Sequence, residues 1–353
     1  MADLGRTNSW RQELKKNFMV AGIALAALII GGATFSSISS DQSGEEITEL
    51  TIYSGRSEEF IAPFLSNWER KSGINLNVRY GDSAELAAQI LEEGQNSPAD
   101  LFLSQDAGSL GAVSTAGLLS KLDDGVARKI DGSFIAGDRS WVGVTGRARV
   151  FAYRPDAIEV LPQSINDLKS PIFKGKIGIA PSNSSFQAFV TALINEKGEK
   201  FAEDWLRALK SNDAQIYLKN SAIVEAIDKG DISLGLVNHY YIWEVSEAFG
   251  REIQVANGFF EPGDIGNLVN VSGVGILATS VKKSAAQDLI NFLTSQPIQA
   301  RFVEKTHEYS LIPGSKAPES LPDLASIGSP RVDLESLENV QRTQDLLIKV
   351  GLL

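Results

Sequence analysis

Cysteine is absent from this sequence of 353 residues, and the only histidines are His239 and His307. Without cysteine there are no disulfide bonds, thiolate metal sites, iron–sulfur clusters or lipid-modified cysteine behind a signal peptide. Two histidines are too few for a zinc site built from several imidazoles. Any metal ion that this chain binds must therefore be held mostly by oxygen atoms.

An excess of basic residues is lacking too, because the formal net charge is -11. Nucleic-acid grooves and anionic membrane surfaces both select clustered Lys and Arg, so the charge argues against both partners. With 43% hydrophobic and 22% charged residues the composition is globular. The length leaves room for two domains with proper cores.

The run from Phe18 to Phe35 carries no charged residue, follows Arg11, Lys15 and Lys16, and leads into a small polar segment. This pattern predicts an export signal. Cleavage after the polar segment and retention of the apolar run as a single membrane anchor are both open. The run is short for a transmembrane helix and long for the apolar part of a signal peptide. Residues 1–46 are thus expected to be a signal peptide or anchor plus tether. The rest of the chain is expected in the periplasm or at the cell exterior.

Strand-like and helix-like patterns alternate after this segment, which predicts an α/β fold with a parallel layer. The expected strands are 50–53, 74–80 and 99–104, and the expected helices are 60–71, 86–93 and 107–116. Asp82 is expected to cap the second helix. Ligands of such sheets bind beyond the carboxyl ends of the strands, where Ser57, Glu58, Gln105 and Asp106 fall.

Two long β-rich runs, 141–153 and 268–277, are predicted to cross between two lobes. Two crossings make the first lobe discontinuous. We expect lobe 1 at 47–146 and 269–322, lobe 2 at 147–268, and a C-terminal helical tail at 323–353 that packs on lobe 2. Within the tail, Leu334 to Val350 is predicted to be one helix.

A Ser/Asn turn at 181–185 precedes the helical run from Phe186 to Asn195. Its backbone N–H groups and hydroxyls at a helix N-terminus would suit an anion. An ordinary helix cap is the equally open alternative.

Two adjacent phenols, Tyr240 and Tyr241, follow the apolar run that ends at Asn238. In a continuing strand they would point to opposite faces, so both serve one site only if the chain turns there from strand to helix. A phenol has a reference pKa of about 10, and a hard trivalent cation would favour its ionised form. We therefore predict a metal site on Tyr240 and Tyr241. One ring in the core and the other at the surface is the competing interpretation.

From Leu50 to the C-terminus the chain resembles the periplasmic ferric-ion-binding proteins, the substrate-binding subunits of iron(III) ABC importers. The matching stretches are Tyr53-Ser-Gly-Arg56, Glu92-Glu-Gly-Gln-Asn-Ser-Pro-Ala-Asp100, Gly146-Arg-Ala-Arg-Val150, Lys174-Gly-Lys-Ile-Gly178, Asn238-His-Tyr-Tyr241 and Glu308-Tyr309. The resemblance implies a two-lobe periplasmic binding protein fold with two β-strand hinge crossovers, and a binding protein instead of an enzyme.

The resemblance also implies a ligand set. The paired tyrosine ligands of Fe(3+) fall on Tyr240 and Tyr241, and the pocket for a synergistic carbonate or phosphate falls on Asn183, Ser184, Ser185, Asn220 and Asn238. Arg147 is the candidate charge partner of the anion or, alternatively, a structural hinge arginine. The expected partner is an ABC permease, and the chain is expected to be a monomer.

The first lobe departs from the family pattern, because Ser57 and Gln105 stand where a His and a carboxylate are usual. Glu58 and Asp106 are the candidate replacement ligands. The favoured alternative for each of them is a solvated or helix-N-terminal acid, which the helix dipole stabilises without any metal.

Two other functions remain to be weighed. A binding protein of the same fold could hold an organic anion, such as a phosphonate or a sugar phosphate, on the Ser/Asn turn and Arg147. An exported hydrolase would need His239 as its base, but the sequence offers neither cysteine nor a Gly-x-Ser-x-Gly elbow.

Overall fold

The computed structural model describes residues 47–353, so the predicted export segment lies outside the described residues. No described helix combines the length and the hydropathy needed to cross a membrane. The described strands join in hydrogen-bonded order β2-β1-β3-β10-β5-β8-β6-β7, with β4, β9 and β11 attached at the sides. Strand β5 belongs to both halves of this order, and the two halves are called the first and second lobe below.

The sheet of the first lobe is parallel where the sequence predicts it to be. Strand β1 runs parallel to β2 and β3, with Ile52 opposite Val78 and Leu101. Strand β10 pairs antiparallel with β3. The strands are β1 (Glu49–Ser54), β2 (Asn75–Tyr80), β3 (Leu101–Ser104), β4 (Leu119–Ser120), β10 (Val269–Leu277) and β11 (Tyr309–Ser310).

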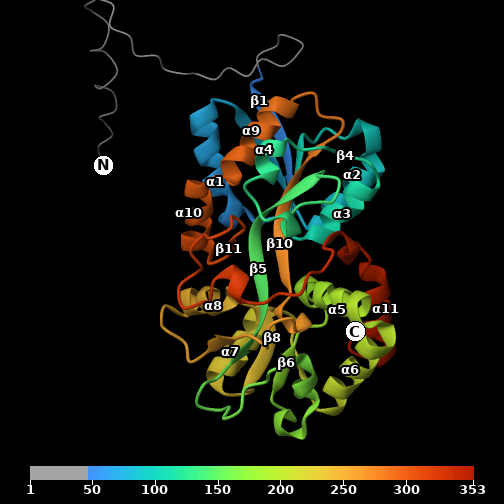
Figure 1. The fold of residues 1–353 in the computed structure, drawn as a ribbon, viewed down its shortest axis with the longest axis vertical. Helices are drawn as coiled ribbons and strands as arrows, with labels where there is room; N and C mark the ends of the chain where they lie inside the picture. Colours follow the sequence, from blue (N-terminus) through green and yellow to red (C-terminus); the bar gives the residue numbers. More distant parts are fainter. Residues whose placement is uncertain (1–46) are drawn as a thin grey trace, which may run out of the picture. The chain divides into compact units, whose positions relative to one another are not determined.

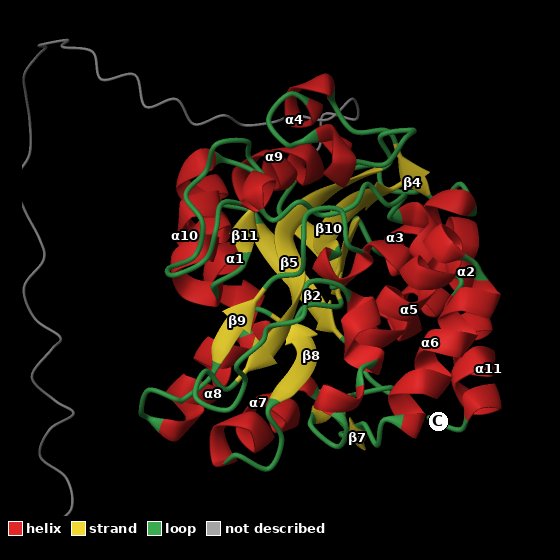
Figure 2. Ribbon diagram, turned by 60° about the horizontal axis from the view of Figure 1, so that its bottom comes forward, coloured by secondary structure: helices red, strands yellow, loops and turns green. Residues whose placement is uncertain are grey.

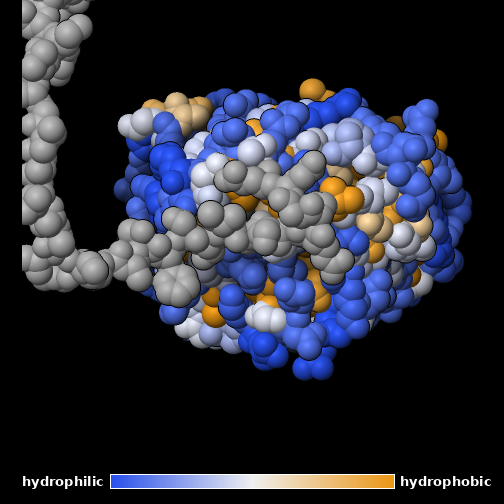
Figure 3. Space-filling view, turned by 90° about the horizontal axis from the view of Figure 1, so that it is seen from above, coloured by the Kyte–Doolittle hydropathy of each residue, from blue (hydrophilic) through white to orange (hydrophobic). Residues whose placement is uncertain are grey.

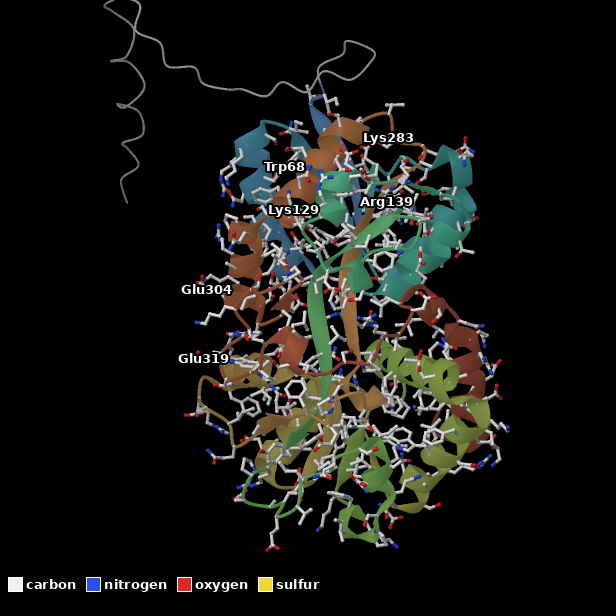
Figure 4. All side chains as sticks on the ribbon, in the orientation of Figure 1. Trp68, Lys129, Arg139, Lys283, Glu304 and Glu319 are labelled. Carbon is white, nitrogen blue, oxygen red and sulfur yellow. The ribbon has the colours of Figure 1, made fainter. Side chains whose placement is uncertain are left out.

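The first lobe is covered by helices that match the predicted ones to within a few residues. Asp82 accepts hydrogen bonds from the backbone N–H of Ala84 and Glu85, which confirms the predicted cap. Trp68 of α1, labelled in Figure 4, is buried and donates to Asp288 on another helix. The helices are α1 (Glu58–Ser72), α2 (Ser83–Glu93), α3 (Ala107–Thr115), α4 (Asp124–Ala127), α9 (Lys283–Leu293) and α10 (Gln296–Thr306), with 3-10 turns η1 (Gly94–Asn96) and η2 (Gly132–Phe134).

The second lobe has a smaller sheet, in which β8 pairs antiparallel with β5 and parallel with β6. Its strands are β6 (Ile177–Ile179), β7 (Gln215–Ile216), β8 (Leu234–Asn238) and β9 (Ala256–Gly258). Its helices are α5 (Ser184–Lys197), α6 (Glu199–Ser211), α7 (Asn220–Lys229) and α8 (Tyr241–Phe249), with 3-10 turns η3 (Ile165–Lys169), η4 (Pro171–Phe173) and η5 (Ile265–Asn267).

Strands β5 (Trp141–Tyr153) and β10 connect the lobes, which confirms both predicted crossovers (Figure 1). Residues Trp141 to Ala148 of β5 pair with β10, and Arg149 to Tyr153 pair with β8 of the second lobe. Gly146 lies close to this change of partner. A Cβ atom there would come within 2.9 Å of Leu311 Cδ2, so a larger residue beside the hinge would require the Leu311 side chain to shift.

The C-terminal part differs from the predicted single helix. The 3-10 turns η6 (Leu324–Ser326) and η7 (Glu335–Glu338) precede α11 (Val340–Val350), and η7 and α11 are separated at Asn339. Asn339 has φ -81° and ψ 61°, and its side chain accepts from the backbone N–H of Arg342. The residue thus starts a new helix instead of continuing the old one. The limits of the lobes and tail that the sequence suggests stay a prediction.

The surface at the end of the first lobe is mostly hydrophilic. Figure 3 shows this end with smaller hydrophobic areas among polar residues. Such dispersed apolar residues are usual on a protein surface and identify no binding patch there.

Candidate functional site

The tyrosine pair lies at a strand-to-helix turn, as the sequence predicts. Strand β8 ends at Asn238, Tyr240 already has helical backbone angles, and α8 begins at Tyr241. The two rings pack with their centroids 4.6 Å apart and their planes tilted by 30°. The structure therefore brings both phenols to one place, with Tyr240 buried and Tyr241 partly buried, and the metal site on them stays a prediction.

Burial holds the phenol of Tyr241 in its neutral form as long as no cation is present. Tyr240 is 8% exposed. The pKa of Tyr241 is raised far above its ordinary value, first by burial and then by Tyr240. Asn220 acts in the opposite direction and lowers the pKa of Tyr241. Ionising both phenols here requires a positive charge at the hydroxyl groups.

The Ser/Asn turn is a helix cap that is tied to the tyrosines. Asn183 Oδ1 accepts from the backbone N–H of Ser185 at 3.0 Å and from its hydroxyl at 2.6 Å. Asn220 donates to Asn183 Oδ1 at 3.2 Å and to Ser185 Oγ at 3.0 Å. Since Asn220 also contacts Tyr241, it joins the cap of α5 to the phenol pair. Ser184 is exposed on the first turn of α5, and Asn238 is buried at the end of β8.

Arg149 is a site residue that the sequence reasoning missed. It donates to Ser185 Oγ at 3.1 Å and lies over the rings of Phe186 and Phe189. Burial lowers its pKa to about 10, and Tyr241 and Tyr240 act against that decrease. The alternation of side chains along a strand was the available signal, because it places Arg149 on the same face of β5 as Arg147.

Two more arginines are buried near Arg149. Arg56 forms a bidentate ion pair with Glu308, with both N–O distances at 2.7 Å. Arg56 also interacts electrostatically with Tyr240. Arg147, the predicted charge partner of the anion, donates to the backbone carbonyl of Gln105 at the end of β3. It therefore has a structural contact, and whether it also binds an anion stays a prediction.

Three buried polar atoms around the site lack a hydrogen-bond partner within residues 47–353: Arg147 Nε, Arg149 Nη2 and Asn220 Oδ1. Buried polar groups are normally paired, so unpaired ones call for an explanation. Arg56 is offset by Glu308, whereas Arg147 and Arg149 have no carboxylate partner among the described residues. The site thus has spare positive charge and suits an anionic ligand.

The first-lobe candidates Glu58 and Asp106 have partners other than the tyrosine pair. Glu58 is exposed in the first turn of α1, and its electrostatic neighbour is Tyr80 on β2. Asp106 caps α3, accepting from the backbone N–H of Ser109 at 2.8 Å and from its hydroxyl at 3.1 Å. Ser57 is exposed, and Gln105 is half-buried. The helix-terminal role is visible for both acids, and their role as ligands stays a prediction.

Another first-lobe acid, Glu59, interacts with the second lobe. The pKa of Glu244 on α8 is raised by burial and then by Glu59, while Lys219 lowers it. Glu244 also interacts with Tyr241. No signal in the sequence distinguished Glu59 from Glu58, because only the orientation of α1 decides which acid approaches α8.

His239 is not available as a general base. Its Nε2 lies 2.7 Å from the carbonyl oxygen of His307, and its Nδ1 lies at hydrogen-bond distance from the backbone of Ala148. Burial lowers its pKa to about 4. The residue links the hinge strand β5 to the end of α10, so the geometry gives no support to a hydrolase.

Among the described residues, the two phenols are the main clustered groups that could ligate a metal ion. Within residues 47–353, no group of three or more His, Asp or Glu side chains is placed to hold a metal. A metal bound here would depend on the tyrosines, on an anion beside Arg149, and on an acid from the first lobe.

Two lobes joined by a pair of strands, with the candidate site built on strand ends and helix N-termini, define a solute-binding protein. The model of the family described as "Bacterial extracellular solute-binding protein" matches residues 96–328. The chain is 31% identical over 310 residues to the Fe(3+)-binding periplasmic protein of Serratia marcescens, covering 86% of this chain and 90% of that one. It is also 31% identical over 315 residues to the major ferric iron-binding protein of Neisseria meningitidis serogroup B, covering 87% and 94%.

Solved structures agree with this assignment. Iron-bound HitA from Pseudomonas aeruginosa superimposes with a TM-score of 0.79 at 32% identity, covering 86% of this chain and 99% of that chain. A Trichodesmium protein in complex with iron and citrate has a TM-score of 0.75 at 26% identity, with the same coverage. The chain belongs to the family of bacterial extracellular solute-binding proteins that includes the periplasmic ferric-binding proteins, which confirms the predicted membership and fold. The similar proteins are binding proteins and not enzymes.

Proposed function

We propose that this protein captures ferric iron outside the cytoplasmic membrane and delivers it to an ABC permease. The observation that carries the proposal is the pair of phenols, with ring centroids 4.6 Å apart, beside the buried guanidinium group of Arg149. The relatives named for ferric iron binding support the choice of cargo.

Binding would exchange protons for the metal. Burial keeps Tyr241 protonated in the empty protein, since its pKa is raised. A ferric ion at the two hydroxyl groups supplies the charge that makes phenolates favourable, and the protons leave to solvent. Ferric iron is hydrolysed in neutral water, so the carrier must offer enough anionic oxygen to compete with hydroxide.

A carbonate or phosphate ion would complete the charge balance. In the proposal the oxyanion accepts hydrogen bonds from the turn at Asn183, Ser184 and Ser185, and from the unpaired Nη2 of Arg149. Arg147, Asn220 and Asn238 form the rest of the pocket. Ionised donors and acceptors make stronger hydrogen bonds than neutral ones, so the spare positive charge of Arg149 favours a bound oxyanion.

Ligands from both lobes would couple binding to closure. The tyrosines belong to the second lobe, and the candidate acids Glu58 and Asp106 belong to the first. Only the closed form can bring both sets to one ion, so the cargo binds the closed form more tightly and shifts the lobes towards it.

Location and partners follow from the family. Periplasmic relatives support a place outside the cytoplasmic membrane, and the solute-binding family supports a permease partner. A monomer is the simplest carrier for one ion. The mass of the exported protein decides between cleavage behind the segment at 18–35 and its retention as an anchor.

The test is to add ferric citrate to iron-free protein and to record the visible spectrum and the thermal unfolding midpoint. We expect a phenolate-to-iron charge-transfer band and a raised midpoint. Tyr240→Phe and Tyr241→Phe should each weaken the band and lose more than about 100-fold in affinity, because even outer partners of a ligand are worth about 10–100-fold, and the double variant should lose the band. Tyr217→Phe, a control in the same lobe, should keep both. A colourless parent protein with an unmoved midpoint would contradict the proposal.

An organic anion is the second candidate, favoured by the spare charge on Arg149 and by Ser57 and Gln105 in place of the usual ligands. In that case the double Tyr→Phe variant would still bind the anion, only more weakly. Calorimetric titration with a phosphonate and a sugar phosphate distinguishes the two, because an iron carrier releases little heat with either in the absence of metal.

A further inference from the structure

The C-terminal segment, residues 323–353, first contacts the start of β10 and the second-lobe segment that leads into β10, including η5. The hydroxyl of Ser329 accepts from the backbone N–H of Val269, the first residue of β10, at 3.1 Å. The carbonyl of Ile327 accepts from Asn267 Nδ2 at 3.1 Å. Gly328 accepts from the backbone N–H of Gly263 at 2.7 Å. We call residues 323–353 the strap.

Beyond the hinge, the strap packs on the first lobe. The turn η7 lies against α3, and Leu334 and Leu337 are buried there. Gly111 of α3 allows this approach. A Cβ atom at Gly111 would lie 2.9 Å from the carbonyl oxygen of Glu335 and 3.2 Å from its Cα atom. Since real Cβ atoms do not come so close to backbone, the contact depends on glycine at this position.

The strap is equally bound to the second lobe. Asn195 on α5 donates to the carbonyl and the hydroxyl of Ser336 at 3.1 and 3.0 Å. Helix α11 lies along α5 and α6, as Figure 2 shows. Its polar contacts with these two helices are Thr343 to Thr191 at 2.7 Å, Gln344 to Gln187 at 3.2 Å, Arg342 to Glu199 at 2.9 Å and Lys349 to Glu203 at 2.7 Å.

The contact of η7 with the first lobe and the contact of α11 with the second lobe are joined by very little chain. Turn η7 ends at Glu338 and α11 begins at Val340, so Asn339 alone connects them. The side chain of Asn339 is itself used to cap α11. A single residue spans less than about 4 Å of extended chain. The strap therefore cannot absorb a separation of α3 from α5 by stretching.

We propose that the strap is a third connection between the lobes, and that the contact of η7 with α3 opposes opening of the cleft. For the lobes to separate, η7 must leave either α3 of the first lobe or α5 of the second. The contact favours the closed form whether cargo is bound or not. This sets the fraction of empty protein that is closed, and it lowers the rate at which any cargo leaves.

The test uses the absence of cysteine. Glu92→Cys in the first lobe and Glu159→Cys in the second are both exposed positions, and spin labels there report the distance between lobes without background. The perturbation is Gly111→Ala, which gains helix propensity but meets the Glu335 backbone. The matched control is Gly125→Ala, because a Cβ atom at Gly125 meets nothing within 4 Å.

In cargo-free protein, we expect Gly111→Ala to shift the label distances to longer values, with Gly125→Ala unchanged. Inserting Gly-Ser-Gly-Ser between Glu338 and Asn339, together with Asn195→Ala, is a second perturbation that keeps Asn339 as the cap of α11, releases Ser336 from α5 and lengthens the chain between η7 and α11, and it should lengthen the distances too. Release of cargo should become about tenfold faster in both variants, because the free-energy cost of overpacking one contact commonly corresponds to such a factor. Folded variants whose distances equal the parent's would overturn the proposal. The cargo-free distances are readable even if the cargo is not iron.

Discussion

Replacing Arg149 by Met separates two effects that usually move together, the stability of the empty protein and its affinity for cargo. The guanidinium group is 3% exposed, and Nη2 has no partner among the described residues. Burial has lowered its pKa to about 10 from 12.5. Methionine keeps most of the hydrophobic stem and its packing on Phe186 and Phe189, while it removes the charge.

The magnitude follows from the pKa. A decrease from 12.5 to about 10 corresponds to about 3 kcal/mol against the charged form at 1.36 kcal/mol per pH unit. The empty protein should therefore be unharmed or stabilised, by up to about 3 kcal/mol before the lost bond to Ser185 is subtracted. Removing a buried charge that pairs with bound anion or phenolate should cost about 2–4 kcal/mol of binding, roughly 30- to 1000-fold in affinity.

The assay is urea unfolding of empty protein, together with a competition titration against a ferric chelator. The expected result is an unfolding free energy at or above the parent value and a weakened affinity. Arg207→Met is the control, because Arg207 is exposed and forms only a surface pair with Glu203. A variant that loses stability while its affinity is unchanged would refute the assignment of Arg149 to the site.

Two further predictions concern acids. Glu308→Gln leaves Arg56 buried without its partner and should lower the unfolding free energy at pH 7 by about 3–5 kcal/mol. Arg56 holds the pKa of Glu308 below its ordinary 4.5 against the opposing effect of burial, so the stability from this pair is present above pH 4.5 and is lost as pH falls through the lower folded value. Urea titrations should show that decline in the parent and a flatter one in the variant. Asp106→Asn keeps the cap of α3, because Asn caps a helix as well as Asp does. A loss of iron affinity of about tenfold or more without loss of stability would therefore identify Asp106 as a ligand. The same titration of Glu58→Gln examines the other candidate.

Much of the fold was readable from the sequence because the signals were local. Alternating strand and helix patterns predict the first-lobe sheet, and two long β-rich runs predict the crossovers that β5 and β10 form. The tyrosine pair was predictable for the same reason: the apolar run ending at Asn238 is followed by residues that allow a turn into α8. The break at Asn339 was missed, because helical periodicity continues through it.

The sequence by itself determined the oxygen chemistry of the site, the paired phenols and the two-lobe plan, since each depends on residue types and on periodicity within a short stretch. Tertiary structure alone decided that Arg149 meets Ser185, that Glu59 instead of Glu58 faces α8, and that Glu335 rests on Gly111. These pairs join residues far apart in the chain. Their meeting depends on how whole helices and strands pack, which no local pattern encodes.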